Sequence, residues 1–399
     1  MTGHESKGAA VVPAVGTPGS VTAIRSLGRH GVHTVAVSEK QSPPSFSSRY
    51  CDETAVVPSP TEDLDGYADA LLELAAHDAV EAVIPVREED IYVLAKHREA
   101  FAEHIGTPWP SFDKLQDVHD RHRLFAAAER AGVPAPDTKP LDEVENWDRN
   151  RIVKGRYAFL TADTVDGVPP GQSVAPPKTV FLEPGVEPDI EGLIESMGHV
   201  PIAQAYVDGP EYCFRGLYRD GEPVVTSQKR LHRGYKYARG PSIYHEAVDN
   251  PKLAATGRAL LAELDWEGLA SAGFIQNDDG EFELLEINPR IPASVPVDVH
   301  AGVDYPVRYW ELARDPTVNR PTDYRPGTTS HLLRGELVYL HSIIREDYPL
   351  AERPSLPGEV WNVASSLISE PRFDLLSLDD PGPFVRDTLN AVQGVVGRN

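Results

Sequence analysis

The chain has 399 residues, 41 % of them hydrophobic, and its 61 acidic against 38 basic residues give a formal net charge of −23. This length exceeds what one compact core accommodates, so two or three packed units are expected, and the hydrophobic share excludes a disordered chain. The acidic balance argues against binding to nucleic acid through a general basic face.

The cysteines and the apolar runs indicate the compartment. Cys51 and Cys213 stand far apart and form neither a metal-ligand pair nor a disulfide framework. The segment from Met1 to Ala10 is polar and has no apolar stretch typical of a secretion signal. No run of about 18 apolar residues occurs, which is the length that a membrane-spanning helix needs. We therefore expect a cytoplasmic protein without a membrane partner.

The first predicted unit alternates strands and helices. Between its first strand and first helix, Gly16 to Gly19 form a tight turn, which does not match the fingerprint of a dinucleotide-binding loop. The order strand, turn, helix, strand predicts a parallel sheet with helices on both faces. The elements expected are strands at 9–15, 32–37 and 82–86 and helices at 20–30 and 64–76.

Residues 107–113 read Thr-Pro-Trp-Pro-Ser-Phe-Asp, interrupt this alternation and mark a boundary. Farther on, residues 161–188 are rich in Pro and Gly and predict a long irregular loop. The sequence Asn-Asp-Asp-Gly from Asn277 to Gly280 predicts a hairpin turn. The other elements expected are helices at 115–131 and 251–264 and strands at 201–207, 212–218, 223–227, 268–276, 281–288 and 331–339.

Three polar side chains belong to the strand predicted at 281–288 and its end. Alternate residues of a strand face one way, so Glu286 and Asn288 point to the same face, with Arg290 close beyond. Carboxylate and amide oxygens suit a hard cation such as Mg²⁺, and a guanidinium suits a phosphate or a carboxylate. The alternative is an ordinary hairpin whose polar face is only hydrated.

Two earlier segments accompany this strand. Lys154 ends the buried stretch Ile-Val-Lys just before the irregular loop, and Gln204 to Glu211 read Gln-Ala-Tyr-Val-Asp-Gly-Pro-Glu. In this order the three segments resemble the ATP-grasp superfamily, which has a strand ending in Lys, a mobile loop, a hinge segment and a late Glu-x-Asn-x-Arg strand. The resemblance covers residues 115–310.

The resemblance implies an α/β fold in which a Rossmann-like N-terminal domain precedes a clamp of α+β type, the two-subdomain ATP-grasp fold. The domains expected are 8–110 for the Rossmann-like domain, 115–205 for the small ATP-grasp subdomain, 206–320 for the large subdomain and 325–399 for a C-terminal extension.

The resemblance also implies roles for single positions. Glu286 and Asn288 match ligands of Mg²⁺ or Mn²⁺, and Arg290 matches the arginine that meets the substrate carboxylate or the transferring phosphoryl group. The loop 161–177 would close over the phosphates and exclude water. The positions matching nucleotide contacts are Arg121 and Lys154 for the phosphates of ATP, Gln204, Tyr206 and Val207 for the adenine, and Glu211 for the ribose.

One position departs from the family's pattern. Members usually carry an acid or Gln on the strand before the metal-binding Glu, where this chain has Ala272 and Gly273. One metal site is therefore expected to be weak or differently liganded. A basic cluster at 228–233 offers Lys229 and Arg230 to the triphosphate or to an acidic substrate, or else pairs with surface acids.

The function implied is an ATP-dependent carboxylate–amine ligase that activates a carboxylate as an acyl phosphate for attack by an amine. Its partners would be small-molecule carboxylate and amine substrates, and a homo-oligomer is left open. Two other interpretations stay open: a sensor that binds ATP without turnover, which Gly273 favours, and a carboxylase-like protein that activates bicarbonate. His119 and His122 lack further ligands in sequence and are expected at the surface.

Overall fold

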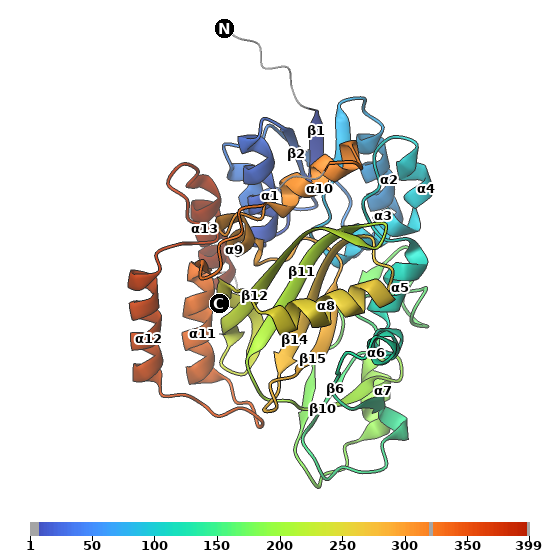
Figure 1. Cartoon of the computed structure of the whole chain (residues 1–399), viewed down its shortest axis with the longest axis vertical. Helices are drawn as coiled ribbons and strands as arrows, with labels where there is room; N and C mark the ends of the chain where they lie inside the picture. Colours follow the sequence, from blue (N-terminus) through green and yellow to red (C-terminus); the bar gives the residue numbers. More distant parts are fainter. Residues whose placement is uncertain (1–7, 319–321, 397–399) are drawn as a thin grey trace.

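Residues 8–318 and 322–396 are described in the computed structural model of the chain. The N-terminal part is a parallel sheet in the order β3-β2-β1-β4, flanked by helices (Figure 1). Every residue of β1 is buried, as in a strand covered on both faces. The Rossmann-like α/β arrangement is confirmed. Its elements are β1 (Ala9–Pro13), α1 (Pro18–Arg29), β2 (His33–Ser38), β3 (Glu53–Val56), α2 (Leu64–Ala75), β4 (Val80–Val83), α3 (Glu88–Lys96) and α4 (Arg98–Ala102).

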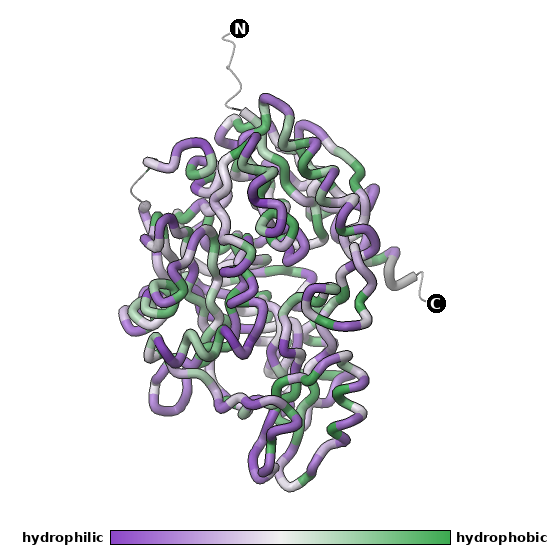
Figure 2. Tube along the Cα trace, turned by 90° about the vertical axis from the view of Figure 1, so that its right-hand side faces the viewer, coloured by the Kyte–Doolittle hydropathy of each residue, from purple (hydrophilic) through white to green (hydrophobic). Residues whose placement is uncertain are grey.

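A small antiparallel sheet follows in the order β5-β10-β6-β9, and with α7 it forms the lobe at the bottom of Figures 1 and 2. The single helix expected at 115–131 is two helices. Asp120 leaves the helical conformation, and its carboxylate caps the second helix by accepting the N–H of His122 at 3.0 Å. The elements are α5 (Phe112–His119), α6 (Arg121–Arg130), β5 (Thr138–Pro140), β6 (Arg151–Lys154), β9 (Val180–Leu182), α7 (Ile190–Met197) and β10 (Ile202–Ala205).

The irregular segment after β6 lies against the N-terminal sheet domain. Asp163 pairs with Lys96 of α3 at 2.7 Å, and the N–H of Leu64 donates to the carbonyl of Gly171 at 2.7 Å. The segment is therefore held at two points by the domain in front of it. It contains the short hairpin of β7 (Leu160–Thr161) and β8 (Ser173–Val174).

The large sheet has the strand order β15-β14-β11-β12-β13-β16, with antiparallel neighbours. Helix α8 covers one face so closely that a Cβ on Gly257 would lie 2.3 Å from the Phe214 side chain. One cluster of buried apolar side chains joins this sheet to the N-terminal one. The elements are β11 (Glu211–Arg219), β12 (Glu222–Lys236), β13 (Arg239–Ala247), α8 (Pro251–Glu263), β14 (Gly268–Gln276), β15 (Phe282–Asn288), α9 (Val295–His300), α10 (Tyr305–Arg314) and β16 (Thr329–His331).

Helices dominate the C-terminal extension. The strand expected at 331–339 is wrong, because only β16 is extended and the next helix begins at Leu333. Its buried residues Gly335, Tyr339 and Ile343 recur every four positions, and a short apolar run does not distinguish this spacing from a strand. In the described part of the chain, no helix has the length and apolar character needed to cross a bilayer. The helices are α11 (Leu333–Arg345), α12 (Leu356–Ser369) and α13 (Gly382–Val396).

The acidic stretch 373–381 ties the C-terminal extension to α1. Asp380 accepts a hydrogen bond from Nε of Arg25 at 2.8 Å, and both side chains are buried. Asp379 pairs with Arg29 at 2.8 Å nearer the surface. The last part of the chain is thus fixed on the first helix.

Candidate functional site

A row of four residues crosses one face of the large sheet. The register of the strands places side by side Lys229 (β12), Cys213 (β11), Gly273 (β14) and Glu286 (β15). Directly paired residues of an antiparallel sheet project to the same face. The ammonium group of Lys229 and the carboxylate of Glu286 therefore share one face, although they lie far apart in sequence.

A chain of hydrogen bonds leads from Glu286 to the N-terminal domain. Glu286 accepts from the amide of Asn288 at 2.9 Å, and the amide oxygen of Asn288 accepts from Nη2 of Arg290 at 3.1 Å. Nε of Arg290 donates to Glu88 of α3 at 2.7 Å. Burial raises the pKa of Glu88, but the charge of Arg290 and the hydrogen bond of His119 outweigh it and lower this pKa to about 2. Glu88 is therefore ionised at neutral pH and holds Arg290 in place.

Sequence reasoning missed Glu88 and misplaced His119. His119 was expected at the surface but is buried, with Nε2 at 3.1 Å from Glu88 and its ring beside Phe159. No local pattern marks these residues, because the partner of each lies in a different domain. An acid at the start of a helix is in itself an ordinary helix signal.

Two half-buried cations lie next to the row. Lys154 ends β6 and Arg121 begins α6, and the charge of Glu286 acts on both. Burial and the charge of Arg121 lower the pKa of Lys154 to about 7, against the opposing effect of Glu286. Within the described residues neither cation forms an ion pair, and Nε of Arg121 has no hydrogen-bond partner. Two neighbouring cations that are partly withdrawn from water and form no ion pair favour the binding of an anion here.

A cavity of about 600 Å³ opens beside the predicted hinge. Nε2 of Gln204 donates to Thr138 at 2.8 Å, whereas its buried Oε1 has no partner among the residues described. The backbone N–H of Tyr206 donates to the carbonyl of Asn150 at 3.0 Å. This N–H is therefore already used within the protein, so a backbone contact of Tyr206 with a ligand would have to come from its carbonyl. Apolar parts of the wall come from Ile152, Phe181 and Leu285.

Glu211 lies at the start of β11, between the cavity and the row. Burial raises its pKa, the charges of Arg239 and Lys229 oppose the rise, and Glu286 adds to it. Arg239, which sequence reasoning missed, lies 3.4 Å from Glu211 and donates to the carbonyl of Val207 at 2.9 Å. Its backbone φ of 94° is strained for a residue with a side chain. Glu211, Lys229 and Glu286 therefore lie close enough on this face of the sheet, the cleft face, for the charges of Lys229 and Glu286 to act on Glu211.

Sequence comparisons cover parts of the chain. A family model described as the PylC-like, N-terminal domain matches residues 11–108. Pyruvate carboxylase of Bacillus subtilis (strain 168) is 22 % identical over 306 residues, which are 71 % of this chain and 26 % of that protein. The chain therefore spans about a quarter of the length of the curated relative that it matches.

Solved structures share most of the architecture. An ADP complex of purK, N5-carboxyaminoimidazole ribonucleotide synthetase, matches with a TM-score of 0.60 and 14 % identity over 93 % of this chain and 100 % of that one. The biotin carboxylase domain of Hydrogenobacter thermophilus 2-oxoglutarate carboxylase, with MgADP and bicarbonate, matches with a TM-score of 0.59 and 17 % identity, over 82 % of this chain and 74 % of that one. L-amino acid ligase from Bacillus licheniformis matches with a TM-score of 0.56 and 14 % identity, over 78 % of this chain and 77 % of that one. The chain has the ATP-grasp fold.

Arg230 does not join the cleft of this ATP-grasp fold, contrary to the sequence prediction. It is paired with Tyr212 in the register and projects to the sheet face opposite that of Lys229. There Arg230 is exposed, and its guanidinium carbon lies 5.9 Å from the centroid of the Tyr212 ring. Because side chains alternate along a strand, only one of two neighbouring basic residues can face the cleft.

Few oxygen ligands accompany Glu286 in the cleft. Gly273 lies opposite Glu286, and Ser271 lies opposite Asn288. Across residues 8–318 and 322–396, no group of three or more His, Cys, Asp or Glu side chains could hold a metal ion. One carboxylate and one amide suit Mg²⁺ where phosphate oxygens and water complete its coordination. The donor set thus fits a metal ion that arrives with a nucleotide.

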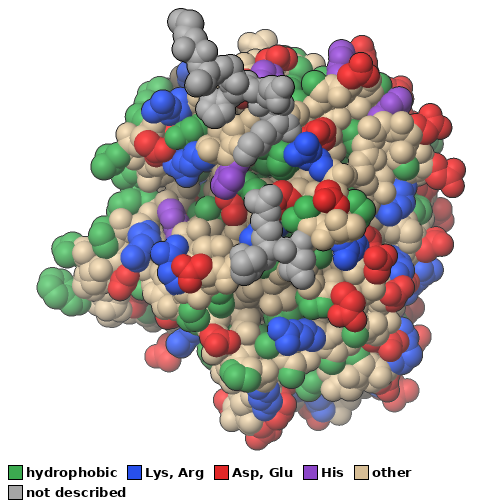
Figure 3. Space-filling view, turned by 45° about the horizontal axis from the view of Figure 1, so that its top comes forward, with side chains coloured by type: hydrophobic (Ala, Val, Ile, Leu, Met, Phe, Trp, Pro, Cys, Tyr) green, Lys and Arg blue, Asp and Glu red, His purple; other side chains and the backbone are tan. Residues whose placement is uncertain are grey.

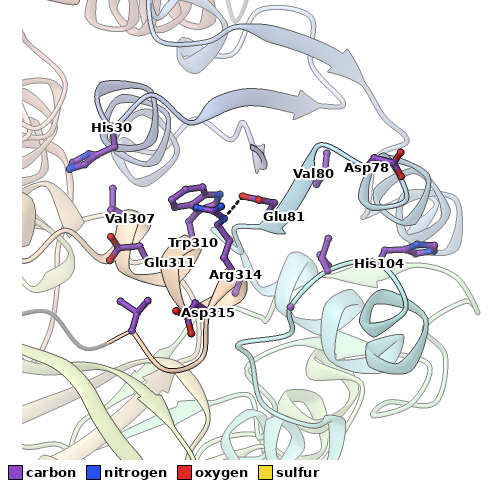
Figure 4. Close-up of a pocket in the computed structure, with 14 residues that line it drawn as sticks. His30, Asp78, Val80, Glu81, His104, Val307, Trp310, Glu311, Arg314 and Asp315 are labelled. Carbon is purple, nitrogen blue, oxygen red and sulfur yellow. Dashed lines mark ion pairs between the residues drawn. The ribbon is translucent and has the colours of Figure 1, made fainter. Parts of the chain in front are cut away.

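A second, larger cavity of about 710 Å³ lies between α10 and β4 (Figure 4). Glu81 and Arg314 form an ion pair of 2.7 Å there, and the guanidinium of Arg314 lies 4.5 Å from the Trp310 ring. None of the residues predicted from the ATP-grasp resemblance lines this cavity. The predicted site residues therefore lie away from this more spacious opening.

Proposed function

We propose that the chain is an ATP-dependent ligase that joins a small-molecule carboxylate to an amine. The γ-phosphoryl group of ATP passes to a carboxylate oxygen, and ADP leaves. The amine nitrogen then attacks the acyl carbon and expels inorganic phosphate. The observation that carries the proposal is the pair of half-buried cations Lys154 and Arg121. They form no ion pair among the described residues, and the charge of Glu286 acts on both. The ATP-grasp fold supports the same conclusion.

ATP fits the cleft group by group. The triphosphate would supply the negative charge that Lys154 and Arg121 lack, and Nε of Arg121 has a free N–H to donate. The free Oε1 of Gln204 can accept a hydrogen bond from the exocyclic amino group of adenine, and Glu211 can accept hydrogen bonds from the ribose hydroxyls. The purK and biotin carboxylase structures are described as complexes with ADP and MgADP. Because the reaction draws on ATP, we propose that the protein acts in the cytoplasm.

Glu286 and Asn288 would hold the metal ion that accompanies ATP. We propose Mg²⁺, with Mn²⁺ as a substitute, because both prefer oxygen ligands. When bound, the metal neutralises charge on the phosphates during transfer. Asn288 is already oriented by its bonds to Glu286 and Arg290, so the pair needs little rearrangement to offer its oxygens.

Arg290 and Lys229 are the groups we propose for the carboxylate and the transferring phosphoryl group. Glu88 and Asn288 fix the guanidinium of Arg290. Lys229 is buried, lies 3.4 Å from the hydroxyl of Ser294, and has a pKa lowered by burial. Fixed cations at a site poor in water stabilise developing charge without reorganisation. Their role would be to align the carboxylate with the γ-phosphate.

Gly273 favours one competing function, a protein that binds ATP and does not turn it over. The position opposite Glu286 carries no second acid, which reduces the charge available to hold a metal. Such a sensor would bind ATP as tightly as the ligase and would release no ADP when substrates are added.

The deciding experiment measures ADP release by the purified chain with Mg-ATP, with and without a mixture of amino acids. Release that depends on the mixture, together with an amide product seen by mass spectrometry, is the expected result. Tight ATP binding without ADP release would establish the sensor. Release that depends on bicarbonate, without an amide product, would establish a carboxylase-like activity.

We also propose that copies of the chain associate through α12. Val360, Trp361 and Ile368 are 47 %, 73 % and 81 % exposed, and Figure 3 shows apolar side chains at the edge where α11 and α12 project. The helix carries one charged residue, Glu359, in a chain of net charge −23, so two copies can approach there with little repulsion. Light scattering should give a dimer that Trp361→Asp converts to a monomer, and a monomeric wild-type chain would contradict the proposal.

A further inference from the structure

The loop between α11 and α12 reaches the cavity beside the hinge. Asp347, Tyr348 and Pro349 line this cavity of about 600 Å³ together with Gln204 and Val207. The loop belongs to the C-terminal extension and leaves α11 at the bottom of the helix pair in Figure 1. One side of the cavity is thus supplied by a segment outside the region that resembles the ATP-grasp superfamily.

The loop is anchored on the tip of the β12–β13 hairpin. The N–H of Tyr348 donates to the hydroxyl of Tyr237 at 3.0 Å, and this hydroxyl donates to the carbonyl of Glu346 at 3.4 Å. Lys236 pairs with Glu346 at 2.9 Å, and its Nζ lies 5.3 Å from the centroid of the Tyr348 ring. The same tip carries Arg239, which holds the hinge carbonyl. Loop and hinge therefore rest on one support.

The ring of Tyr348 belongs to a group of aromatic rings beside the cavity. Its centroid lies 5.1 Å from that of Tyr237 and 6.1 Å from that of Phe181, both edge to face. Phe181 comes from the small sheet and also lies 6.4 Å from the ring of Tyr206 in the hinge. Phe181, Tyr206 and Tyr348 thus bring rings from the small sheet, the hinge and the C-terminal extension to one cavity. A cavity lined by aromatic and apolar groups, with a few polar groups, suits a flat heterocycle.

We propose that Tyr348 binds the purine base of ATP and closes the cavity from the side of the C-terminal extension. This inference rests on the proposed function, since it assigns a further contact to the same nucleotide. Lys154 and Arg121 do not line the cavity, so contacts to the base and to the phosphates involve different side chains. The two sets can therefore be tested separately, with ATP for both and with inorganic tripolyphosphate for the phosphate contacts alone.

The test measures dissociation constants for ATP and tripolyphosphate by calorimetry on the full chain. Tyr348→Ala should weaken ATP binding by roughly ten-fold, the scale of one aromatic contact with a base, and leave tripolyphosphate binding unchanged. Tyr348→Phe, which keeps the ring, should bind ATP like the wild type. In turnover, Tyr348→Ala should raise the KM for ATP by the same factor and leave kcat unchanged.

Tyr50→Ala is the matched control. Tyr50 is also partly buried, its hydroxyl donates to Asp379 at 2.9 Å, and its ring lies 5.3 Å from the guanidinium of Arg29, but it does not line the cavity. Equal ATP affinity in the wild type and Tyr348→Ala overturns the inference and leaves the proposed function intact. An equal loss for ATP and tripolyphosphate also overturns it, because this pattern means damage to the fold.

Two further outcomes are decisive. A wild-type chain that binds neither ATP nor tripolyphosphate overturns the proposed function and the inference together. If Tyr348→Ala does not fold, Tyr348→Leu replaces it, since leucine keeps apolar volume but has no aromatic face. The same ten-fold loss for ATP alone supports the inference, and unchanged ATP binding by a folded Tyr348→Leu overturns it.

Discussion

Gly273 lies directly opposite Glu286 in the pairing of β14 with β15. A Cβ at this glycine would meet the Cγ of Glu286 at 3.6 Å, an ordinary contact, so the position has room for a side chain. The missing acid is thus not forced by crowding. In the proposed ligase it means that Glu286 is the carboxylate that faces the metal from this part of the sheet.

Gly273→Glu should lower the Mg²⁺ concentration needed for half-maximal ADP release by about ten-fold, because a second carboxylate adds charge to the metal site. The measurement is a magnesium titration at fixed, saturating ATP. Gly273→Gln is the matched control, since it adds the same volume without the charge. An identical shift in both variants would mean that size and not charge matters there, and would count against metal binding at this face.

The affinity for ATP should fall as pH rises above neutrality. Burial and the charge of Arg121 lower the pKa of Lys154 to about 7. Without bound ATP, Lys154 therefore loses its proton as the pH rises above 7, whereas binding of the phosphates requires its charged form. Binding then requires uptake of a proton, and the dissociation constant should rise by up to about ten-fold per pH unit above pH 7. Calorimetry in buffers of different ionisation enthalpy measures both the affinity and the proton uptake.

Lys154→Arg separates this effect from the titration of the nucleotide itself. Arginine stays charged across the same pH range, so this variant should retain binding and lose the added slope. Lys154→Gln should bind weakly at every pH. A wild-type slope identical to that of Lys154→Arg would show that Lys154 is not the group that titrates.

Lys229 and Arg230 should differ sharply, although they are neighbours in sequence. Lys229 is buried on the cleft face, whereas Arg230 is exposed on the opposite face beside Tyr212. Lys229→Met should reduce kcat for ADP release by about 100-fold or more, the scale of losing one fixed group that stabilises charge. Arg230→Met should stay within about two-fold, because an exposed cation on the far face touches no reacting atom. Comparable losses in both variants would contradict the assignment of faces.

The parts of the fold that depend on local pattern could be predicted from the sequence. The strand expected at 268–276 is β14 with those bounds, because the turn from Asn277 to Gly280 marks its end. Helix α11 was mistaken for a strand because its apolar residues allow both periods over a short stretch. The sequence alone could not show which of Lys229 and Arg230 faces the site, because this depends on the pairing register of the whole sheet.

Contacts between domains could not be predicted. Contacts such as those of Glu88 with Arg290 and of Tyr348 with Phe181 form only when distant segments pack together. The spacing of residues along the chain does not indicate such contacts. The fold also decides which polar groups stay unsatisfied. The sequence shows Lys154 only as a lysine at the end of a strand, whereas its lowered pKa results from burial and from the charge of Arg121 in the folded chain. Sequence patterns suggest which side chains carry chemistry, and packing determines their charge.

Asp298 should be a stability residue. It is fully buried, pairs with Arg215, and accepts a hydrogen bond from Ser227 at 2.6 Å. Asp298→Ala leaves a buried guanidinium without its counter-charge and should lower the free energy of unfolding by about 3–5 kcal/mol, measured by urea denaturation. As a control, Glu281→Ala breaks an exposed pair with Lys252 and should cost less than about 1 kcal/mol. Equal values for the two variants would refute the importance of burial.

Glu286→Gln should abolish ADP release while the chain keeps its fold. The amide preserves the size of the side chain and its bond to Asn288, so the loss isolates the negative charge that faces Lys154 and the metal. We expect kcat to fall by at least about 100-fold, with ATP still bound when Mg²⁺ is absent. Glu283→Gln, a change on the same strand outside the row, should turn over normally. ADP release at the wild-type rate by Glu286→Gln would remove this carboxylate from the reaction, and with it the reason to place the metal at the late strand.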